Sequence, residues 1–445
     1  MIESRPKVTF KQINRLALPA LIAGIAEPLL SITDTAIVGN IDENATEALA
    51  AVGIAGSFLS ALFWILAQTR SAISSVVAQY LGAKRLDDIK TMPAQIIMIN
   101  IVLSIFLGVV TMVFAESIFK LYNAGDLILQ FSVEYYKIRA FGLPFTLFVF
   151  SVFGVFRGLQ NTFWPMIISI VGAVTNVLLD FTLVYGIEGI ITPMNIKGAA
   201  YASVIAQAIM AVMALVLLLK KTPFTLKFQL PFNREIKRLL MLSFNLFIRA
   251  LALNIALYFA NAYATKYGDN YIAAQTMAFQ IWLFFAFFID GYSSVGNIVS
   301  GRLLGEKDYK NLWNLSLDLS KYAIVVAIIL GVVSAVFYRP IGDMFTDDEN
   351  VKNTFYAVFW IVLIMQPLNA VAFVFDGLFK GLAKGAKLRN TLLIATFIGF
   401  IPTLLLGDWL NFKLYGVWLA FFVWMFLRGG ILVLYFRKEY LTVKN

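Results

Sequence analysis

The sequence predicts an all-α membrane protein with about twelve transmembrane helices, arranged as two six-helix repeats in parallel orientation. Composition is the first of three observations behind this prediction. Of the 445 residues, 60% are hydrophobic and 14% are charged, and the mean hydropathy is +0.80. The second observation is a series of apolar runs, each long enough to cross a hydrocarbon layer of about 30 Å as a helix. The third is a similarity between the two halves of the chain.

The apolar runs recur along the whole chain and are separated by short polar breaks. A helix satisfies its own backbone hydrogen bonds inside a membrane, whereas strands need a closed barrel with alternating polarity, which these runs lack. We therefore predict helices throughout. The predicted spans lie near residues 14–39, 48–80, 92–115, 132–156, 163–187, 196–219, 238–265, 271–301, 319–338, 354–380, 390–408 and 414–436.

Charged residues in the breaks predict the orientation. Lys and Arg gather in alternate breaks, as at Lys84–Arg85 and Lys220–Lys221, while the other breaks are acidic or nearly bare. Short loops rich in Lys and Arg stay in the cytoplasm, so we expect both termini to be cytoplasmic. We expect the protein to lie in the plasma or inner membrane of a bacterium or archaeon. The net charge of +10 is then explained by the Lys and Arg residues of the cytoplasmic loops, and we expect no nucleic-acid partner.

The two halves of the chain resemble each other at a single offset. A shift of 223 positions brings Gln79–Lys84 over Arg302–Lys307, and Gly154–Leu159 over Gly377–Leu382. Six helices per half is an even number, so both repeats run in the same direction, as in transporters that expose a central site to either side in turn. We predict an N-terminal bundle over residues 1–220, a cytoplasmic linker over 221–238 and a C-terminal bundle over 239–445.

The chain contains no cysteine and no histidine. Disulfides, thiol nucleophiles, zinc sites with the usual ligands and imidazole proton relays are therefore excluded. We expect no catalytic residues, no enzymatic activity and no cofactor. Any proton or ion chemistry must use carboxylates, hydroxyls, amides and basic side chains.

The first span carries two acids and two prolines inside an apolar run. An acid at the bilayer centre costs about 2.5–3.5 kcal/mol, so an acid at this depth suggests a functional site. Glu27 and Asp34 are two helical turns apart and share one face. Pro19 and Pro28 each remove an intrahelical hydrogen bond and are candidate hinges. The alternative is that Asp34 is only packed against a neighbouring helix or solvated at the surface.

The fifth and sixth spans supply candidate neighbours for these acids. Asn176 and Asp180 are four residues apart on one helix face, and Ser203 adds a hydroxyl group. Together with Asp34 they form a set of hard oxygen ligands suited to a proton or a small alkali cation. Repulsion between the acids is expected to favour a protonated form of one of them. The alternative is that Asn176 and Asp180 only hydrogen-bond between helices.

The second half also places polar side chains inside predicted spans. In one interpretation they line a substrate cavity; in the other, Asp376 pairs with Lys380 and Asp290 pairs with Arg249 in purely structural ion pairs. The candidate cavity residues are Asp290, Asp376, Arg249, Gln275 and Asn254.

Several of these segments together resemble a known family. The segment Thr33–Gly39 with its acid, the Asn176/Asp180 pair, the loop Gln79–Lys84 and the segment Gly198–Ser203 are similar to the multidrug and toxic compound extrusion (MATE) family, and most similar to its DinF-like branch. The resemblance extends over essentially the whole chain.

The resemblance implies a V-shaped pair of bundles and a multidrug efflux antiporter working by alternating access. Members export amphipathic, often cationic organic compounds in exchange for H⁺ or Na⁺. Asp34 would match the essential acid, with Asn176 and Asp180 as its network, and Pro19 would lie in the bending helix. If Na⁺ is the coupling ion, Asp34, Asn176 and Asp180 would hold it. The expected partners are small organic molecules and the lipid bilayer, and we expect a monomer. The alternative is a lipid-linked precursor flippase of the same superfamily, which would have a more cationic cavity.

Overall fold

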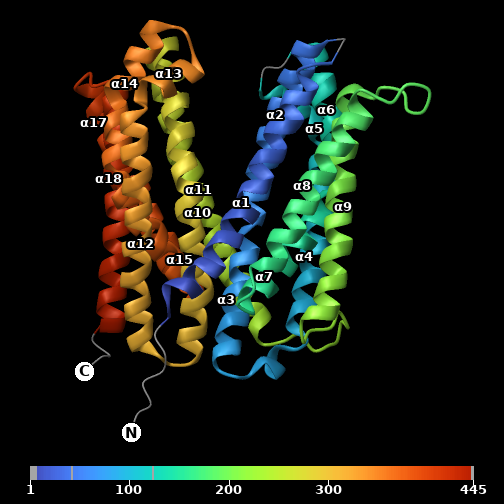
Figure 1. Cartoon of the computed structure of the whole chain (residues 1–445), viewed down its shortest axis with the longest axis vertical. Coiled ribbons are helices and arrows are strands. Elements are labelled where there is room, and N and C mark those ends of the chain that lie inside the picture. The colour runs from blue at the N-terminus through green and yellow to red at the C-terminus, as the bar shows by residue number, and fades with distance from the viewer. Residues whose placement is uncertain (1–7, 42–43, 123–124, 442–445) are drawn as a thin grey trace. The chain divides into compact units, whose positions relative to one another are not determined.

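The computed structural model is built from helices (Figure 1). It describes residues 8–41, 44–122 and 125–441, and the side chains of residues 26–32 are not described. Within these ranges the only β-type pairing is an isolated bridge between Ile187 and Ile191. The all-α class is therefore confirmed.

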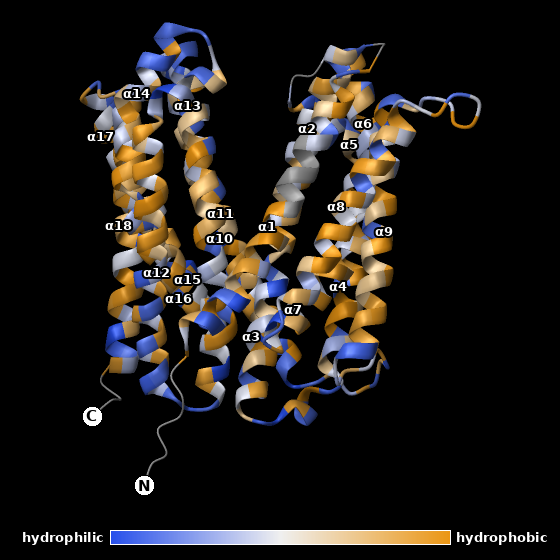
Figure 2. Ribbon diagram, in the orientation of Figure 1, coloured by the Kyte–Doolittle hydropathy of each residue, from blue (hydrophilic) through white to orange (hydrophobic). Residues whose placement is uncertain are grey.

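Each predicted apolar run coincides with a helix or a bent pair of helices. Nine segments of the described chain are long and apolar enough to cross a membrane. Two bent pairs pass the same test together, with bends of 48° between Asp126–Ala140 and Leu143–Gly158 and of 51° between Glu349–Ile364 and Gln366–Gly381. The helix Phe10–Val38 covers the remaining run. Figure 2 shows hydrophobic residues along the helices and hydrophilic residues gathered at many of their ends.

The chain divides into two compact units. The N-unit comprises residues 22–77 and 85–239, and the C-unit comprises residues 240–445, 78–84 and the N-terminal segment as far as Leu21. Helices α1 and α3 contribute residues to both units. The division at residues 221–238 expected from the sequence stays a prediction.

The N-unit packs through small and aromatic side chains. Ala48, Ala51 and Ala55 lie on one buried face of α2, where small residues let neighbouring helices approach closely. Phe119 and Tyr136 extend this core, with ring centroids 5.5 Å apart. The helices of this unit are α1 (Phe10–Val38, in part), α2 (Ala45–Leu66), α3 (Gln68–Gly82, in part), η1 (Leu86–Ile89), α4 (Met92–Val113), α5 (Ala115–Lys120), α6 (Asp126–Ala140), α7 (Leu143–Gly158), α8 (Phe163–Val184) and α9 (Asn195–Lys221).

The C-unit has a more aromatic core. Phe421 lies between Trp418 and Phe400, with ring centroids 5.2 and 5.0 Å away. Its further helices are α10 (Glu235–Tyr267, almost all in this unit), α11 (Asp269–Gly305), α12 (Tyr309–Val336), α13 (Tyr338–Phe345), α14 (Glu349–Ile364), α15 (Gln366–Gly381), α16 (Gly385–Ile394), the π-helical segment η2 (Ala395–Phe400), α17 (Ile401–Trp409), α18 (Leu414–Phe436) and η3 (Arg437–Leu441).

Equivalent backbone contacts confirm the internal repeat. A Cβ atom on Gly154 would lie 2.8 Å from the carbonyl oxygen of Arg70, and one on Gly377 would lie 2.0 Å from that of Ser293. Both glycines and both partners are related by the same shift of 223 positions. Only a residue without a side chain lets the two helix backbones approach this closely.

The turns repeat in the same way. Lys84 and Lys307 have φ angles of 56° and 58°, and Gln160 and Ala383 have φ angles of 61° and 57°. Left-handed backbone is uncommon outside glycine, so its recurrence at the same offset is specific. Each half therefore uses the same backbone path at these corners.

The polar connection after α9 packs against the N-unit. The Gln95 side chain donates to the carbonyl oxygen of Gln229 at 2.6 Å and accepts from the backbone N–H of Asn233 at 2.8 Å. The Asn233 amide group also donates to the carbonyl oxygen of Asp88 at 2.8 Å. This buried glutamine thereby fastens the connection to the start of α4.

Candidate functional site

Asp34 is a buried acid in the N-unit. Its side chain, on α1, is 3% exposed. Ser203 on α9 donates a hydrogen bond to Oδ2 at 3.0 Å, and the Tyr135 hydroxyl on α6 donates to the same oxygen at 3.4 Å. Oδ1 has no hydrogen-bond partner among the described residues. One oxygen of this carboxyl group is thus held by two hydrogen bonds, while the other is buried without a partner in the described residues.

Asp180 lies beside it on α8. Asn176, one turn earlier, donates to Asp180 Oδ2 at 3.0 Å, and Asp180 Oδ1 likewise has no partner within the described part of the chain. Asp34 and Asp180 are close enough for the charge of each to act on the other. Two buried carboxyl groups therefore face one site, each with one unsatisfied oxygen.

The pattern of α8 explains why its polar pair points inward. Gly172, Asn176, Asp180 and Val184 recur at intervals of four and are buried. Val174, Leu178 and Phe181 point outward and are exposed. This is the reverse of a helix in a soluble protein, because the outer face of a transmembrane helix meets lipid.

Arg139 is the basic group of this cluster. It lies one turn after Tyr135 on α6, and its guanidinium carbon is 5.9 Å from the centre of the Tyr135 ring. Its charge acts on Asp180 and Tyr135, and its Nε atom has no hydrogen-bond partner in the described residues. The site contains two acids and one base. When both acids are ionised its net charge is −1, which a single added cation would neutralise.

The structure brings together Asp34, Asn176, Asp180 and Ser203, as the sequence predicts. Their oxygen atoms are the hard ligands that a proton or Na⁺ prefers. Glu27 and Pro28 lie outside the described side chains. Pro19 is half-buried within α1, which runs without interruption from Phe10 to Val38.

Tyr135 and Arg139 belong to this cluster but are not among the site residues predicted from the sequence. Both lie within the predicted span near residues 132–156, and their spacing of four residues puts them on one helix face. A hydroxyl and a guanidinium group on one helix face inside an apolar run are the sequence feature that could have identified these two residues.

A second cluster of charges lies in the C-unit. Asp376 on α15 accepts two hydrogen bonds from Arg249 on α10 in a bidentate contact, from Nη2 to Oδ2 at 2.6 Å and from Nε to Oδ1 at 3.2 Å. Lys380 lies 3.2 Å from Oδ2 and Arg428, on α18, lies 3.3 Å from Oδ1. The side chains of Asp376, Arg249 and Arg428 are 4%, 6% and 2% exposed. A single buried acid therefore has three basic partners.

This pairing partly corrects the sequence-based alternative. The predicted pair of Asp376 and Lys380 forms, but the predicted pair of Asp290 and Arg249 is wrong. Asp290 is exposed on α11, whereas Asp376 is buried where it meets Arg249. Arg428 was missed, although a lone arginine inside the last apolar run was a visible signal.

The two remaining candidates are separate from these contacts. Gln275 is fully buried on α11, and neither of its side-chain polar atoms has a hydrogen-bond partner in the described chain. Asn254 is exposed on α10 and donates to the carbonyl oxygen of Ala250 at 2.8 Å.

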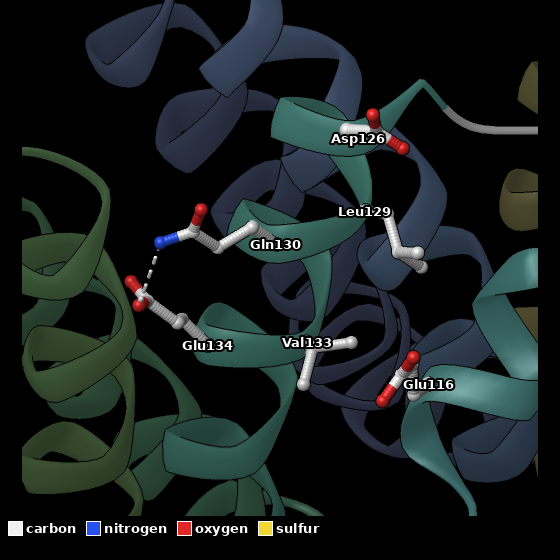
Figure 3. Close-up of a pocket in the computed structure, with 6 residues that line it drawn as sticks. All are labelled: Glu116, Asp126, Leu129, Gln130, Val133 and Glu134. Carbon is white, nitrogen blue, oxygen red and sulfur yellow. Dashed lines mark hydrogen bonds between the residues drawn. The ribbon is translucent and has the colours of Figure 1, made fainter.

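One pocket, of about 370 Å³, lies between α5 and α6 of the N-unit (Figure 3). Glu116, Asp126 and Glu134 line it, together with Leu129, Gln130 and Val133. A hydrogen bond from Lys120, at 2.6 Å, and its charge hold the pKa of Glu116 below the ordinary value. The pocket is therefore lined by acids, and at least one of them stays ionised at neutral pH.

Comparison with known proteins gives consistent results. The family model MatE matches residues 19–182 and 246–406. DNA damage-inducible protein F of Escherichia coli (strain K12) is 24% identical, over 97% of this chain and 92% of its own length. The probable multidrug resistance protein NorM of Halalkalibacterium halodurans is 24% identical, over 94% and 92%. A crystal structure of MATE in the bent conformation has a TM-score of 0.90 at 20% identity, covering 98% of this chain and 96% of that one.

Proposed function

The chain belongs to the MatE family of membrane transporters, and from this premise we propose that it is a secondary active antiporter. It exports amphipathic, cationic organic compounds in exchange for H⁺ or Na⁺ by alternating access. It is an integral membrane protein, and its full-length similarity to multidrug transporters supports an efflux role. We place it in the plasma or inner membrane of a bacterium or archaeon, as a monomer with both termini in the cytoplasm.

The observation that carries the proposal is the pair of buried acids in the N-unit. Asp34 and Asp180 each present an unsatisfied oxygen to one site. Without a bound ion the pair attracts a cationic substrate, and a bound proton or Na⁺ removes that attraction. Coupling follows because the two ligands compete for the same negative charge.

The hydrogen bonds around the pair define the role of each neighbour. Ser203 and Tyr135 both hold Oδ2 of Asp34, so that the carboxyl group turns Oδ1 towards the incoming ion. Asn176 holds Asp180 in the same manner. If Na⁺ is the coupling ion, the carboxyl groups of Asp34 and Asp180 and the amide oxygen of Asn176 would hold it.

Arg139 supports exchange of one charge at a time. When both acids are ionised, Arg139 offsets one of the two negative charges, and one added cation, a proton included, brings the cluster to neutrality. A neutral cluster is the least costly state in a low-dielectric environment. We therefore expect one coupling ion to be exchanged at this site for each singly charged substrate.

Transport in proteoliposomes tests the proposal. Ethidium efflux is followed under a pH gradient alone and under a Na⁺ gradient alone, with the wild type, Asp34→Asn and the exposed-acid control Asp269→Asn. We expect one gradient to drive efflux in the wild type and the control, and Asp34→Asn to abolish that drive. Failure of both gradients to move the dye, with folded protein, would reject multidrug antiport.

The lipid-linked precursor flippase is the second candidate. The basic cluster around Asp376 is the observation that favours it, because three cations beside one acid suit an anionic head group. Flipping of a fluorescent anionic lipid, without any dye efflux, would identify this activity instead.

A further inference from the structure

The cluster around Asp376 in the C-unit contains more positive than negative charge. Arg249, Lys380 and Arg428 are in contact with the single acid Asp376. Asp290 also acts on Lys380 and Arg428 through its charge, but it is exposed. Three positive groups therefore face two negative ones, and only one of the negative groups is buried. An uncompensated buried charge is costly, so the cluster favours an additional anion.

The guanidinium group of Arg428 also has one N–H group without an acceptor in the described chain. Its Nη2 atom reaches Asp376 at 3.3 Å, but its Nε–H has no acceptor among the described residues, although the side chain is only 2% exposed. A buried donor without an acceptor costs about 1–3 kcal/mol. A ligand that supplies an acceptor there recovers part of this energy.

Aromatic rings connect Arg428 to a second unsatisfied donor. Its guanidinium carbon lies 4.9 Å from the centre of the Phe373 ring, and Phe373 lies 6.2 Å from Trp282. The indole N–H of Trp282, which is 7% exposed, has no acceptor within the described chain. Gln275, with its two unsatisfied side-chain atoms, lies two turns from Trp282 along α11.

We propose that this part of the C-unit binds an organic anion, with a carboxylate or phosphate group at Arg428 and an aromatic or apolar body against Phe373 and Trp282. Arg249 and Lys380 contribute charge, and Gln275 offers a polar contact further along α11. Phe373 is half-buried and Asp290 is exposed, so the site reaches the surface of the unit.

A cation is a poor alternative ligand here. Both oxygens of Asp376 already accept from basic groups, and a further cation would add to the excess of positive charge. The proposal deepens the proposed transport function, on which it rests, by adding anionic or zwitterionic compounds to the substrates. Binding is measured without any ion gradient, so its outcome is independent of whether antiport occurs.

The test is direct binding to the purified full-length protein in a neutral detergent. The probe is 1-pyrenebutyrate, whose binding is followed by energy transfer from tryptophan, compared with its uncharged methyl ester. The variants are Arg428→Gln, Asp376→Asn and the control Lys310→Gln, an exposed basic residue on α12. Competition with phosphatidic acid and with phosphatidylcholine separates a lipid source of the anion from a soluble one.

We expect the acid to bind at least about tenfold more tightly than its ester, and Arg428→Gln to weaken binding at least about tenfold, as loss of a charged hydrogen bond predicts. Asp376→Asn removes the competing acid and should tighten binding, a result that misfolding cannot imitate. Competition by phosphatidic acid alone would identify a lipid head group, and its absence a soluble anion. Equal binding of acid and ester, or binding unchanged in Arg428→Gln and Asp376→Asn, would overturn the proposal.

Discussion

Replacing Asp376 with asparagine should destabilise the C-unit strongly. The change removes one negative charge but leaves Arg249, Lys380 and Arg428 in place, two of them at most 6% exposed. Asparagine can still accept one hydrogen bond at its carbonyl oxygen, yet it cannot balance the three positive charges. Breaking a buried ion pair by removing one partner costs about 3–5 kcal/mol. We expect a loss in this range.

Asp408→Asn provides the matched control. Asp408 lies 2.8 Å from Lys266, in the same unit and at a similar distance, but the lysine side chain is 58% exposed. Exposed ion pairs contribute about 0.2–1 kcal/mol. The substitution is the same in both variants, so the comparison contrasts a buried acid that has three basic partners with a more exposed acid that has one.

The free energy of unfolding can be measured by titration with SDS from mixed micelles, followed by circular dichroism. The absence of cysteine rules out thiol-reactive dyes as the probe. We expect Asp376→Asn to lose several times more stability than Asp408→Asn. Equal losses in the two variants would show that the buried cluster does not depend on the charge of Asp376.

Three further predictions follow from contacts within single units. Gly377→Ala should destabilise the protein by about 1–3 kcal/mol in the same SDS titration, because its Cβ would lie 2.0 Å from a carbonyl oxygen; Gly430→Ala, with open space at that position, should not. Ser203→Ala should slow gradient-driven efflux about tenfold, as loss of a hydrogen bond to a charged group predicts, and more than Tyr135→Phe, whose contact is longer; equal effects would contradict the geometry. Gln95→Ala should speed trypsin cleavage in the basic connection after α9, and an unchanged rate would contradict the fastening role of this side chain.

Much of the fold was predictable from the sequence because lipid imposes a simple rule on it. Runs of about twenty apolar residues must become helices, and all twelve predicted runs coincide with helical segments. The residues at which the helices begin and end were less predictable. The run near 319–338 belongs to α12, which begins at Tyr309, because polar residues continue a helix once it leaves the apolar layer.

The candidate site was only partly predictable for a related reason. Asn176 and Asp180 share one helix face, so spacing alone reveals them. The choice between Asp290 and Asp376 as partner of Arg249 depends on how α10, α11 and α15 pack, which periodicity does not encode. Tyr135, Arg139 and Arg428 are single polar side chains among apolar ones. Which acid each of them lies beside depends on the tertiary packing of the helices.

The central claim is that a cationic substrate and the coupling ion compete for Asp34 and Asp180. The most direct measurement is ion release when ethidium is added to the purified protein in a weakly buffered detergent solution, with proton release and displacement of radiolabelled Na⁺ followed in parallel. The account predicts release of about one ion of one kind per ethidium bound by the wild type and by Asp269→Asn, since one cation neutralises the cluster, and none by Asp34→Asn. Ethidium binding that releases neither ion, or equal release from Asp34→Asn, would contradict it.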